Sequence, residues 1–245
     1  MAPHRLMLPQ ARQWLRDARA VAVLTGAGIS AESGVPTFRG PEGLWRQFRP
    51  EELATPEAFA RDPLLVWEWY DWRRQKIAAV TSNAGHLALA ALEKRKERFA
   101  LITQNVDGLH EAAGSRNVLK IHGDIWRLRC TRCRREWTCR DAPLAELPPH
   151  CGCGGLARPG VVWFGEPLPP GVWAKAEEAA AQCEVMLVVG TSAVVYPAAG
   201  LVPLARRGGA RVIEINREPT PVSAACAASL RGLAGEILPA LIAEV

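Results

Sequence analysis

The fold of this chain is decided by one early stretch, Leu24-Thr25-Gly26-Ala27-Gly28-Ile29-Ser30-Ala31-Glu32-Ser33-Gly34-Val35-Pro36-Thr37-Phe38-Arg39-Gly40. It begins where the apolar run 21–24 ends, which is the pattern of a buried parallel strand that enters a turn. The first two glycines would let backbone amides come close to a ligand. A helix that opens at Ser30 or Ala31 would then aim its unpaired N–H groups at a pyrophosphate. The run 26–31 fits the dinucleotide-binding pattern G-x-G-x-x-G/A, and a plain glycine turn at a strand end is the competing interpretation.

The composition is that of an ordinary globular protein, because 49% of the 245 residues are hydrophobic and 22% are charged. This length falls below the roughly 250–300 residues at which one core usually divides, so we expect one compact unit with a small lobe. No apolar run approaches the ~20 residues that cross a membrane, and the first ten residues lack the apolar core of a secretory signal. We therefore expect a cytoplasmic protein without membrane contact. The net charge of +5 is mostly dispersed and does not by itself predict nucleic-acid binding.

Strands and helices alternate in the expected secondary structure, which predicts an α/β fold with a Rossmann-like, doubly wound parallel sheet. Besides 21–24, strand-like runs cover 99–103, 118–121, 161–166, 185–189 and 211–215. Helical patterns cover 9–19, 56–80, 87–98, 171–182, 197–207 and 234–243. A simple dinucleotide-binding unit returns to a second strand within ~30 residues, whereas strand character here returns only at Phe99. This long excursion argues against an ordinary dehydrogenase and for an inserted lobe beside the cofactor.

Four of the seven cysteines form two close pairs, Cys130-x2-Cys133 and Cys151-x-Cys153, separated by seventeen residues. Cysteines paired at short spacing in a reducing compartment favour a metal over disulfides. Four thiolates on two short loops are the ligand set of a tetrahedral structural Zn²⁺, with no open position for catalysis. Cys139 and His150 are the competing ligands.

Polar residues follow two of the expected strands at their carboxyl ends, where open α/β sheets bind ligands. The run Gln104-Asn105-Val106-Asp107-Gly108-Leu109-His110 follows 99–103, and His122-Gly123-Asp124 follows 118–121. His122 is a candidate general base, because an imidazole titrates near neutral pH. A hydrogen-bonded structural histidine is the alternative.

Taken together and in this order, these motifs closely resemble the sirtuin family, the NAD-dependent protein-lysine deacylases. The resemblance extends from about residue 10 to 240. It rests on 26–30, 35–39, 103–110, His122-Gly123, the two cysteine pairs, 190–192 and Asn216. It implies a single catalytic domain over 1–245, with a Rossmann core at about 10–34, 84–124 and 161–245. A helical insert at about 35–83 and a zinc module at about 125–160 would form the smaller lobe. NAD is the implied co-substrate, one Zn²⁺ the implied structural metal, and acylated-lysine proteins are the implied partners.

The resemblance also implies a role for each matching residue. In the family mechanism the acyl oxygen attacks C1′ of the nicotinamide ribose, and the ribose 2′-hydroxyl then attacks the resulting alkylimidate with His122 as its base. The products would be free lysine, nicotinamide and 2′-O-acyl-ADP-ribose. Asn105 and Asp107 would line the nicotinamide pocket, and Phe38 and Arg39 would lie on a loop that closes over the cofactor. The implied cofactor-binding residues are Gly26, Ala27, Gly28, Ser30, Glu32, Phe38, Arg39, Trp45, Gln104, Asn105, Asp107, Gly190, Thr191, Ser192, Asn216, Arg217, Glu218 and Ala234. Of these, the residues from Gly190 onward would frame the adenosine half of NAD.

The helical insert contains a pair of residues that suggests an acyl preference. Tyr70 and Arg73 lie three residues apart and would share a helix face. An arginine fork and a phenol hydroxyl together suit a carboxylate, although a surface arginine beside a core tyrosine is the plainer interpretation. Arg74 is the rival for the same role. The pattern Tyr-x-x-Arg after Trp-Glu-aromatic resembles the sirtuin branch (class III) that removes succinyl, malonyl and glutaryl groups.

The run 161–166 also resembles this branch of the family, and it would pair with the backbone of the substrate peptide. Val161, Trp163 and Phe164 are the implied peptide-binding residues, and the small Ala54 and Ala58 would leave room for a longer acyl chain. The sequence thus predicts desuccinylase and demalonylase activity with some deacetylase activity. Three alternatives are an NAD-dependent oxidoreductase, a zinc-ribbon nucleic-acid binder with arginines around its cysteines, and a mono-ADP-ribosyltransferase of the same family.

Overall fold

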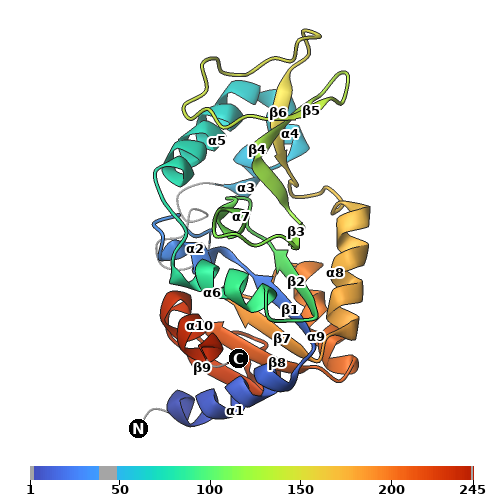
Figure 1. Cartoon of the computed structure of the whole chain (residues 1–245). Helices are drawn as coiled ribbons and strands as arrows, with labels where there is room; N and C mark the ends of the chain where they lie inside the picture. The colour runs from blue at the N-terminus through green and yellow to red at the C-terminus, as the bar shows by residue number, and fades with distance from the viewer. Residues whose placement is uncertain (1–2, 39–48, 244) are drawn as a thin grey trace.

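A six-stranded parallel sheet forms the larger of two lobes in the computed structural model, which describes residues 3–38, 49–243 and 245 (Figure 1). The strands are β1 (Ala20–Thr25), β2 (Arg98–Thr103), β3 (Val118–Lys120), β7 (Val185–Val189), β8 (Arg211–Asn216) and β9 (Ala228–Arg231). Their order is β3-β2-β1-β7-β8-β9, and every neighbouring pair is parallel. The winding reverses between β1 and β7, which is where open α/β sheets bind ligands.

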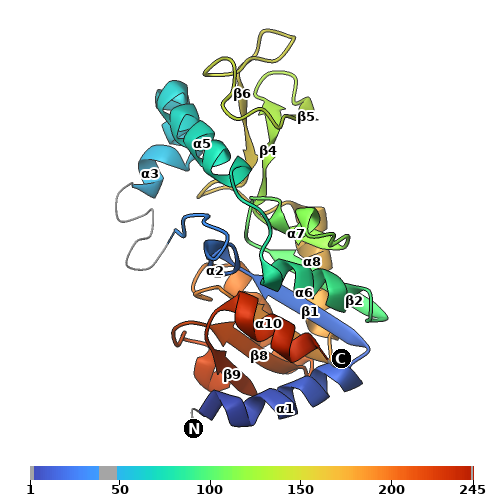
Figure 2. The same ribbon diagram turned by 60° about the vertical axis from the view of Figure 1, so that its left-hand side comes forward.

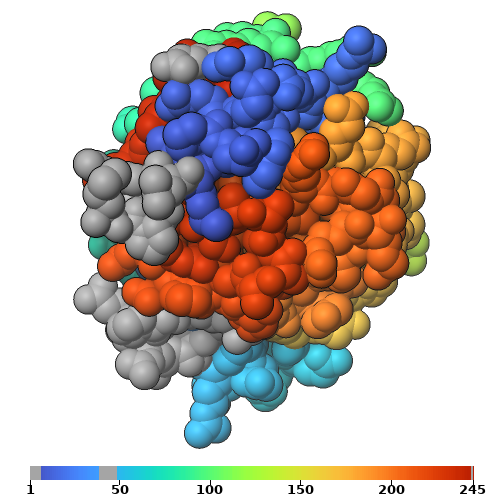
Figure 3. Space-filling model, turned by 90° about the horizontal axis from the view of Figure 1, so that it is seen from below, coloured from blue at the N-terminus to red at the C-terminus, as the bar shows by residue number. Residues whose placement is uncertain are grey.

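Helices cover both faces of this sheet, which confirms the doubly wound architecture. One face packs against α1 (Pro3–Asp17), α6 (Ala84–Glu93) and α10 (Ala234–Ile242). The other face packs against α8 (Pro170–Gln182) and α9 (Leu201–Arg207). Figure 3 shows α1, in blue, lying beside the red and orange C-terminal segments that form much of the face seen from below. All six residues of β1 are buried, as expected for a strand between two helical layers.

The smaller lobe stands over the carboxyl edge of the sheet (Figure 2). It contains α3 (Pro50–Leu53), α4 (Pro56–Arg61) and α5 (Pro63–Ala78), together with β4 (Gly123–Cys130), β5 (Glu136–Thr138) and β6 (Ala157–Val161). The three strands form an antiparallel sheet in the order β5-β4-β6. A separate apolar core rich in tryptophan joins α5 to this sheet, and Trp67, Trp126 and Trp163 are all buried in it. Between the lobes lies the short α7 (Leu109–Ala112).

Several expected element boundaries differ from the structure. The single helix expected at 56–80 is divided into α4 and α5, because Pro63 cannot continue a helix and the Asp62 side chain accepts a bond from the Leu65 N–H at 2.9 Å. The helix expected at 87–98 is α6, which ends at Glu93 because the chain from Arg98 onward pairs with β1. The strand expected at 161–166 is wrong beyond Val161, where β6 ends in a turn. The strand β9 was not expected.

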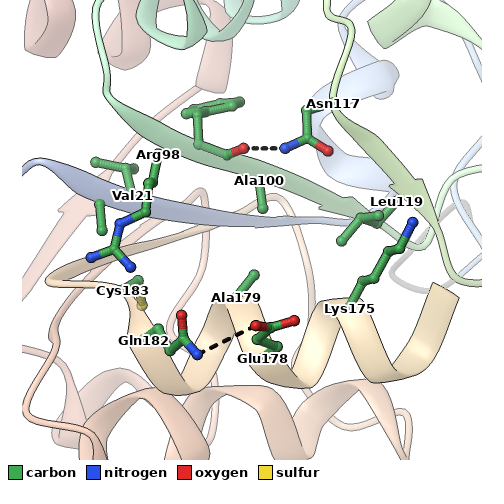
Figure 4. A pocket seen from close by; sticks show the side chains of 12 residues that line it. Val21, Arg98, Ala100, Asn117, Leu119, Lys175, Glu178, Ala179, Gln182 and Cys183 are labelled. Carbon is green, nitrogen blue, oxygen red and sulfur yellow. Dashed lines mark hydrogen bonds between the residues drawn. The ribbon is translucent and has the colours of Figure 1, made fainter. Parts of the chain in front are cut away.

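A shallow groove of about 350 Å³ lies between α8 and the first residues of β1 and β2 (Figure 4). Its floor is formed by small and apolar side chains such as Val21, Ala100 and Leu119, and the Gln182 amide donates to Glu178 at its rim. This groove lies at the starts of the strands and is therefore remote from the carboxyl edge that carries the predicted site. None of the helices in the described part of the chain has the length and apolar character to cross a membrane.

Asn83 connects α6 to the glycine stretch. Its Oδ1 accepts bonds from the N–H groups of Gly85 and His86, and its Nδ2 donates to the Ile29 carbonyl at 2.7 Å. The ring of His86 completes a capping box by accepting the Asn83 N–H at 3.3 Å. One side chain thus caps a helix and holds the segment that follows β1.

We expect Asn83→Ala to lower the free energy of unfolding by about 1–2 kcal/mol, because a helix cap and a partly buried tertiary bond are lost together. Chemical denaturation measures this change. Gln13→Ala, which removes only an exposed bond to Asp17, is the control and should stay within about 0.5 kcal/mol of the parent. Equal stabilities of the two variants would contradict the proposed importance of Asn83.

Candidate active site

The loops after β1, β2, β7 and β8 bring most of the predicted cofactor-binding residues to one edge of the sheet. Gly26 follows β1, Gln104 follows β2, Gly190 follows β7, and Asn216 ends β8. Gln104 Nε2 donates to Thr191 Oγ1 at 2.9 Å, and Asn216 Nδ2 donates to the Thr191 carbonyl at 2.8 Å. Thr191 therefore joins the loops that follow β2 and β8.

The glycines of this edge are required by contacts between backbones. The Gly28 N–H donates to the Gly190 carbonyl at 2.8 Å, and the Gly26 N–H donates to the Val189 carbonyl at 3.0 Å. A Cβ on Gly28 would lie 2.7 Å from the Gly190 Cα, and Gly190 itself has a φ of +57°. The N–H groups of these two glycines thus bond to the end of β7 and the loop after it, and the approach of neighbouring amides to a ligand stays a prediction. The helix expected to open at Ser30 or Ala31 is α2 (Ala27–Ala31), and it begins at Ala27 because Gly26 is the extended residue before it.

A buried polar network follows directly behind α2. Ser30 Oγ donates to Asp107 Oδ2 at 2.8 Å and accepts from Asn105 Nδ2 at 3.1 Å. The His86 ring lies 3.3 Å from the same hydroxyl. Since His86 Nδ1 accepts the Asn83 N–H, its Nε2 carries the proton and donates to Ser30. His86 was missed from the sequence, where the only signal was its position three residues after a capping asparagine.

Asn105 and Asp107 are the candidate residues for binding a carboxamide. Both are buried, with exposures of 8% and 6%. Burial raises the pKa of Asp107, and the Leu109 N–H and the Ser30 hydroxyl oppose that rise. Asn105 Oδ1 accepts no hydrogen bond from any described residue, so it remains an acceptor. Both N–H bonds of Asn105 Nδ2 are already donated, to the Gly26 carbonyl and to Ser30 Oγ, so the pair offers acceptor oxygens, which suit the N–H₂ group of the nicotinamide carboxamide.

His122 is placed at the same edge, after β3. Its Nδ1 lies 3.2 Å from the Gln104 carbonyl oxygen. A carbonyl only accepts hydrogen bonds, so Nδ1 carries the proton and the lone pair of the neutral ring is on Nε2. Burial lowers the pKa of His122 below its usual 6.5, and the bond to Gln104 partly opposes this shift. The arrangement suits a base that is neutral at physiological pH.

Tyr70 and Arg73 lie near the middle of α5, where the Arg73 side chain also contacts Phe38. The Arg73 guanidinium is 4.5 Å from the centre of the Phe38 ring, 4.9 Å from that of Trp69 and 5.8 Å from that of Tyr70. Arg73 is only 7% exposed and makes no hydrogen bond or ion pair with any described residue. Arg74 differs completely, since its guanidinium donates to the carbonyls of Ile125 and Asp141, each at 2.7 Å, and to that of Cys139.

The turn after β6 is held by Glu166, which forms ion pairs with Arg158 and, at 3.9 Å, with Arg129. Arg158 donates to both carboxylate oxygens of Glu166, at 2.6 and 2.8 Å, and Glu166 also accepts the Trp163 N–H. This pairing ends the strand at Val161 and turns the chain. Trp163 Nε1 donates to the Tyr70 hydroxyl at 3.0 Å, whereas Phe164 is 45% exposed and its N–H donates to the Ala54 carbonyl.

Other predicted cofactor-binding residues have different surroundings. The carboxylate of Glu32 accepts the Gly235 N–H at 3.0 Å, so it caps α10, which begins at the buried Ala234. Arg217 and Glu218 are exposed on the loop after β8, and Ser192 follows Thr191. Arg39 and Trp45 lie outside the described residues.

The four predicted cysteine ligands converge at the far end of the smaller lobe. Their sulfur atoms all lie within 4.8 Å of one another, with 3.5 Å between Cys130 and Cys153 and 3.8 Å between Cys133 and Cys151. Zn–S bonds of about 2.3 Å separate tetrahedral sulfurs by about 3.8 Å, so the set fits Zn²⁺. A Cβ on Gly155 would lie 3.0 Å from the Cys130 sulfur, which explains a glycine there. The two competing ligands bond elsewhere, Cys139 with Arg74 and Asp141 and His150 with Glu146.

Comparison with known proteins agrees with this geometry. Residues 26–197 match the Sir2 family. The NAD-dependent protein deacylase 2 of Pyrobaculum aerophilum is 56% identical over 232 residues, which are 94% of this chain and 93% of that protein. A solved Sir2 homologue in complex with NAD superposes with a TM-score of 0.91 at 48% identity, covering 96% of this chain and 93% of the other. The structure of Sir2Af2 bound to a myristoylated histone peptide gives a TM-score of 0.82 at 35% identity, covering 98% and 96%.

The chain therefore belongs to the Sir2, or sirtuin, family. It is an NAD-dependent protein deacylase, with NAD as its co-substrate and a four-cysteine cluster suited to structural zinc.

Removal of zinc should unfold the smaller lobe first, because the two cysteine loops have little apolar core of their own. We expect Cys130→Ala to lower the melting temperature by at least about 5 °C, as measured by calorimetry, and to abolish stoichiometric zinc. Cys226→Ala, which changes a cysteine outside the cluster, should keep one Zn²⁺ per chain. A Cys130→Ala protein that retains one tightly bound Zn²⁺ would show that another ligand set holds the metal.

Proposed function

We propose that this deacylase removes succinyl and malonyl groups, as well as acetyl groups, from protein lysines, and that nicotinamide and 2′-O-acyl-ADP-ribose are released. The observation that carries the acyl preference is the buried Arg73 guanidinium, which is 7% exposed and has no hydrogen-bonding partner among the described residues. The Asp107 carboxylate acts on Arg73 only through space, and a buried guanidinium without an acceptor for its N–H groups costs several kcal/mol. This cost supports an anion that arrives with the substrate.

The surroundings of Arg73 support an acyl carboxylate as that anion. Three aromatic ring centres lie 4.5, 4.9 and 5.8 Å from the guanidinium carbon. No described residue accepts a bond from its N–H groups, so these would be available for a bidentate bond. Because the Tyr70 oxygen already accepts from Trp163 Nε1, its own proton is available for donation. Burial raises the pKa of Tyr70, although the nearby Arg73 opposes this rise, and the phenol thus keeps that proton. The rival Arg74 is fully buried and already donates to three carbonyls.

The other roles that we propose belong to residues at or above the carboxyl edge of the parallel sheet. Bound NAD supplies the ribose to which the acyl group is transferred. Asn105 and Asp107 would hold the nicotinamide carboxamide, and the Nε2 lone pair of His122 would accept the proton of the ribose 2′-hydroxyl. Ala54 and Ala58 lie in the same apolar core as Tyr70, which supports a role for these small side chains in admitting a longer acyl chain. The segment after Val161 would pair with the substrate peptide through its carbonyl groups, because the N–H groups of Val162 and Phe164 already bond within the protein.

His122 must be neutral to act as a base, and its pKa is lowered by burial. The pH at which kcat/KM begins to decline on acidification should therefore lie below 6.5, the usual pKa of a histidine. Activity measured from pH 5 to 8 should therefore stay level down to about pH 6.5 and be lost only at lower pH. In His122→Ala the rate should fall by about 10²–10⁴-fold with the circular dichroism spectrum unchanged. Near-normal turnover in that variant would remove His122 from the mechanism.

For Arg73→Met we expect kcat/KM for a succinyl-lysine peptide to fall about 10–100-fold, which corresponds to one charge-assisted bidentate bond. The value for the acetyl-lysine peptide of the same sequence should change by no more than about threefold, because acetyl has no carboxylate. Arg61→Met changes an exposed arginine of the same lobe and serves as the matched control.

Mass spectrometry of acetyl-, succinyl- and malonyl-lysine peptides incubated with NAD provides these rates and also detects any ADP-ribosylated protein. Equal loss of the acetyl and succinyl activities in Arg73→Met would contradict the carboxylate-binding role. ADP-ribosylated protein without free lysine peptide would favour the mono-ADP-ribosyltransferase alternative.

A further inference from the structure

A buried carboxylate in the middle of β8 has no place in the chemistry described above. Glu214 lies between Ile213 and Ile215 in a strand of the central sheet, and its side chain is 1% exposed. Strand positions of this kind are normally apolar, because both faces of the sheet are covered by helices. A carboxylate in such a position must be stabilised by several hydrogen-bond donors.

The donors all come from the segment that follows β8. Thr220 Oγ1 and Ser223 Oγ donate to the Glu214 carboxylate, the latter at 2.6 Å. Ser229 Oγ donates at 3.0 Å from β9, and the Arg231 guanidinium forms an ion pair at 2.7 Å. Burial alone would raise the pKa of Glu214, but these hydrogen bonds hold it below its usual range, so the group is ionised.

These bonds determine the path of the loop 217–227. Arg231 adds two further links to the same loop, since it donates to the Glu218 carbonyl at 3.3 Å and to Ser223 Oγ at 2.8 Å. The amides within the loop are also used locally, with the Thr220 N–H donating to Ser223 Oγ at 2.7 Å. The Glu214 carboxylate thus holds the loop 217–227 close to β8.

The loop begins with the residues proposed to contact the adenosine half of NAD. Asn216 lies two residues after Glu214 and is held to the β7 loop through the Thr191 carbonyl. Arg217 and Glu218 follow it and are exposed at the carboxyl edge, so their backbone positions depend on how the loop is anchored. The Glu218 carbonyl is held through Arg231, which is itself paired with Glu214.

We infer that Glu214 is a positioning residue for the co-substrate: its carboxylate anchors the loop 217–227 in the conformation that binds the adenosine half of NAD. The inference rests on the proposed placement of the adenosine half at Asn216, Arg217 and Glu218. Glu214 would thus raise the affinity for the adenosine half of NAD, whereas Asn105 and Asp107 would hold the nicotinamide half.

The test compares Glu214→Gln with Glu93→Gln in the full chain. Glu93 is a matched control, because its carboxylate also anchors a loop, accepting the N–H groups of Arg116 and Asn117, but at the opposite edge of the sheet. We expect Glu214→Gln to raise the Kd for ADP-ribose, measured by titration calorimetry, and the KM for NAD by at least fivefold. The kcat at saturating NAD, the inhibition constant for nicotinamide and the KM for an acyl peptide should stay within twofold. Glu93→Gln should leave all of these values within twofold.

Unchanged affinity for ADP-ribose in Glu214→Gln would overturn the inference, and so would an equal weakening of ADP-ribose, nicotinamide and peptide, which indicates general structural damage. Ser223→Ala and Thr220→Val each remove one of the anchoring hydroxyls and should shift the ADP-ribose Kd in the same direction if Glu214→Gln does not fold; no shift in either would overturn the inference. Arg217→Ala and Glu218→Ala test the placement itself. If they leave the ADP-ribose affinity unchanged, the placement and the inference both fail, whereas a loss in these two alone rejects only the role of Glu214.

Discussion

The close contact between the backbones that follow β1 and β7 is the constraint on which the rest of this structure depends. Gly28 and Gly190 approach so closely that neither position admits a side chain, and the Gly28 N–H bonds directly to the Gly190 carbonyl. This contact lies between β1 and β7, at the point where the winding of the sheet reverses. It sets the direction of α2, and thereby the position of Ser30 above Asn105 and Asp107. A glycine pattern that is usually explained by ligand approach is here explained first by packing within the protein.

Two neighbouring arginines show how two buried side chains can differ in their hydrogen-bond partners. Arg73 and Arg74 are both buried in the smaller lobe, and the sequence offered them as rivals for one role. Arg74 donates to three carbonyls and joins α5 to the chain around β4 and the cysteine module. Arg73 is surrounded by aromatic rings and has no such acceptors in the described part of the chain. The difference arises because consecutive helix positions point about 100° apart, so that one faces the second sheet and the other faces the catalytic edge.

Polar side chains in the interior of this protein mostly serve to hold loops at the carboxyl edge. Thr191 joins the loops after β2 and β8, Ser30 joins α2 to Asp107, and Glu214 gathers the loop after β8. Each pays its desolvation cost through several hydrogen bonds made at once, which is the condition under which buried polar groups are tolerated. The catalytic edge is therefore stiffened from within the sheet as well as by the packing of the two lobes.

The sequence by itself determined the alternation of strands and helices, the cysteine set for zinc and the gathering of Gln104, Asn105, Asp107 and His122 at one edge. These follow from local periodicity and from the rule that the ends of parallel strands meet. Tertiary structure alone decided the roles of His86 and Glu214, the end of β6 at Val161, and the different surroundings of Arg73 and Arg74. Each of these depends on partners far away in the chain, such as Asp107 beside Ser30 or Ser229 beside Glu214. Hydrogen-bond partners of this kind leave no periodic signal, because they are chosen by the packing of elements rather than by the residues next to them.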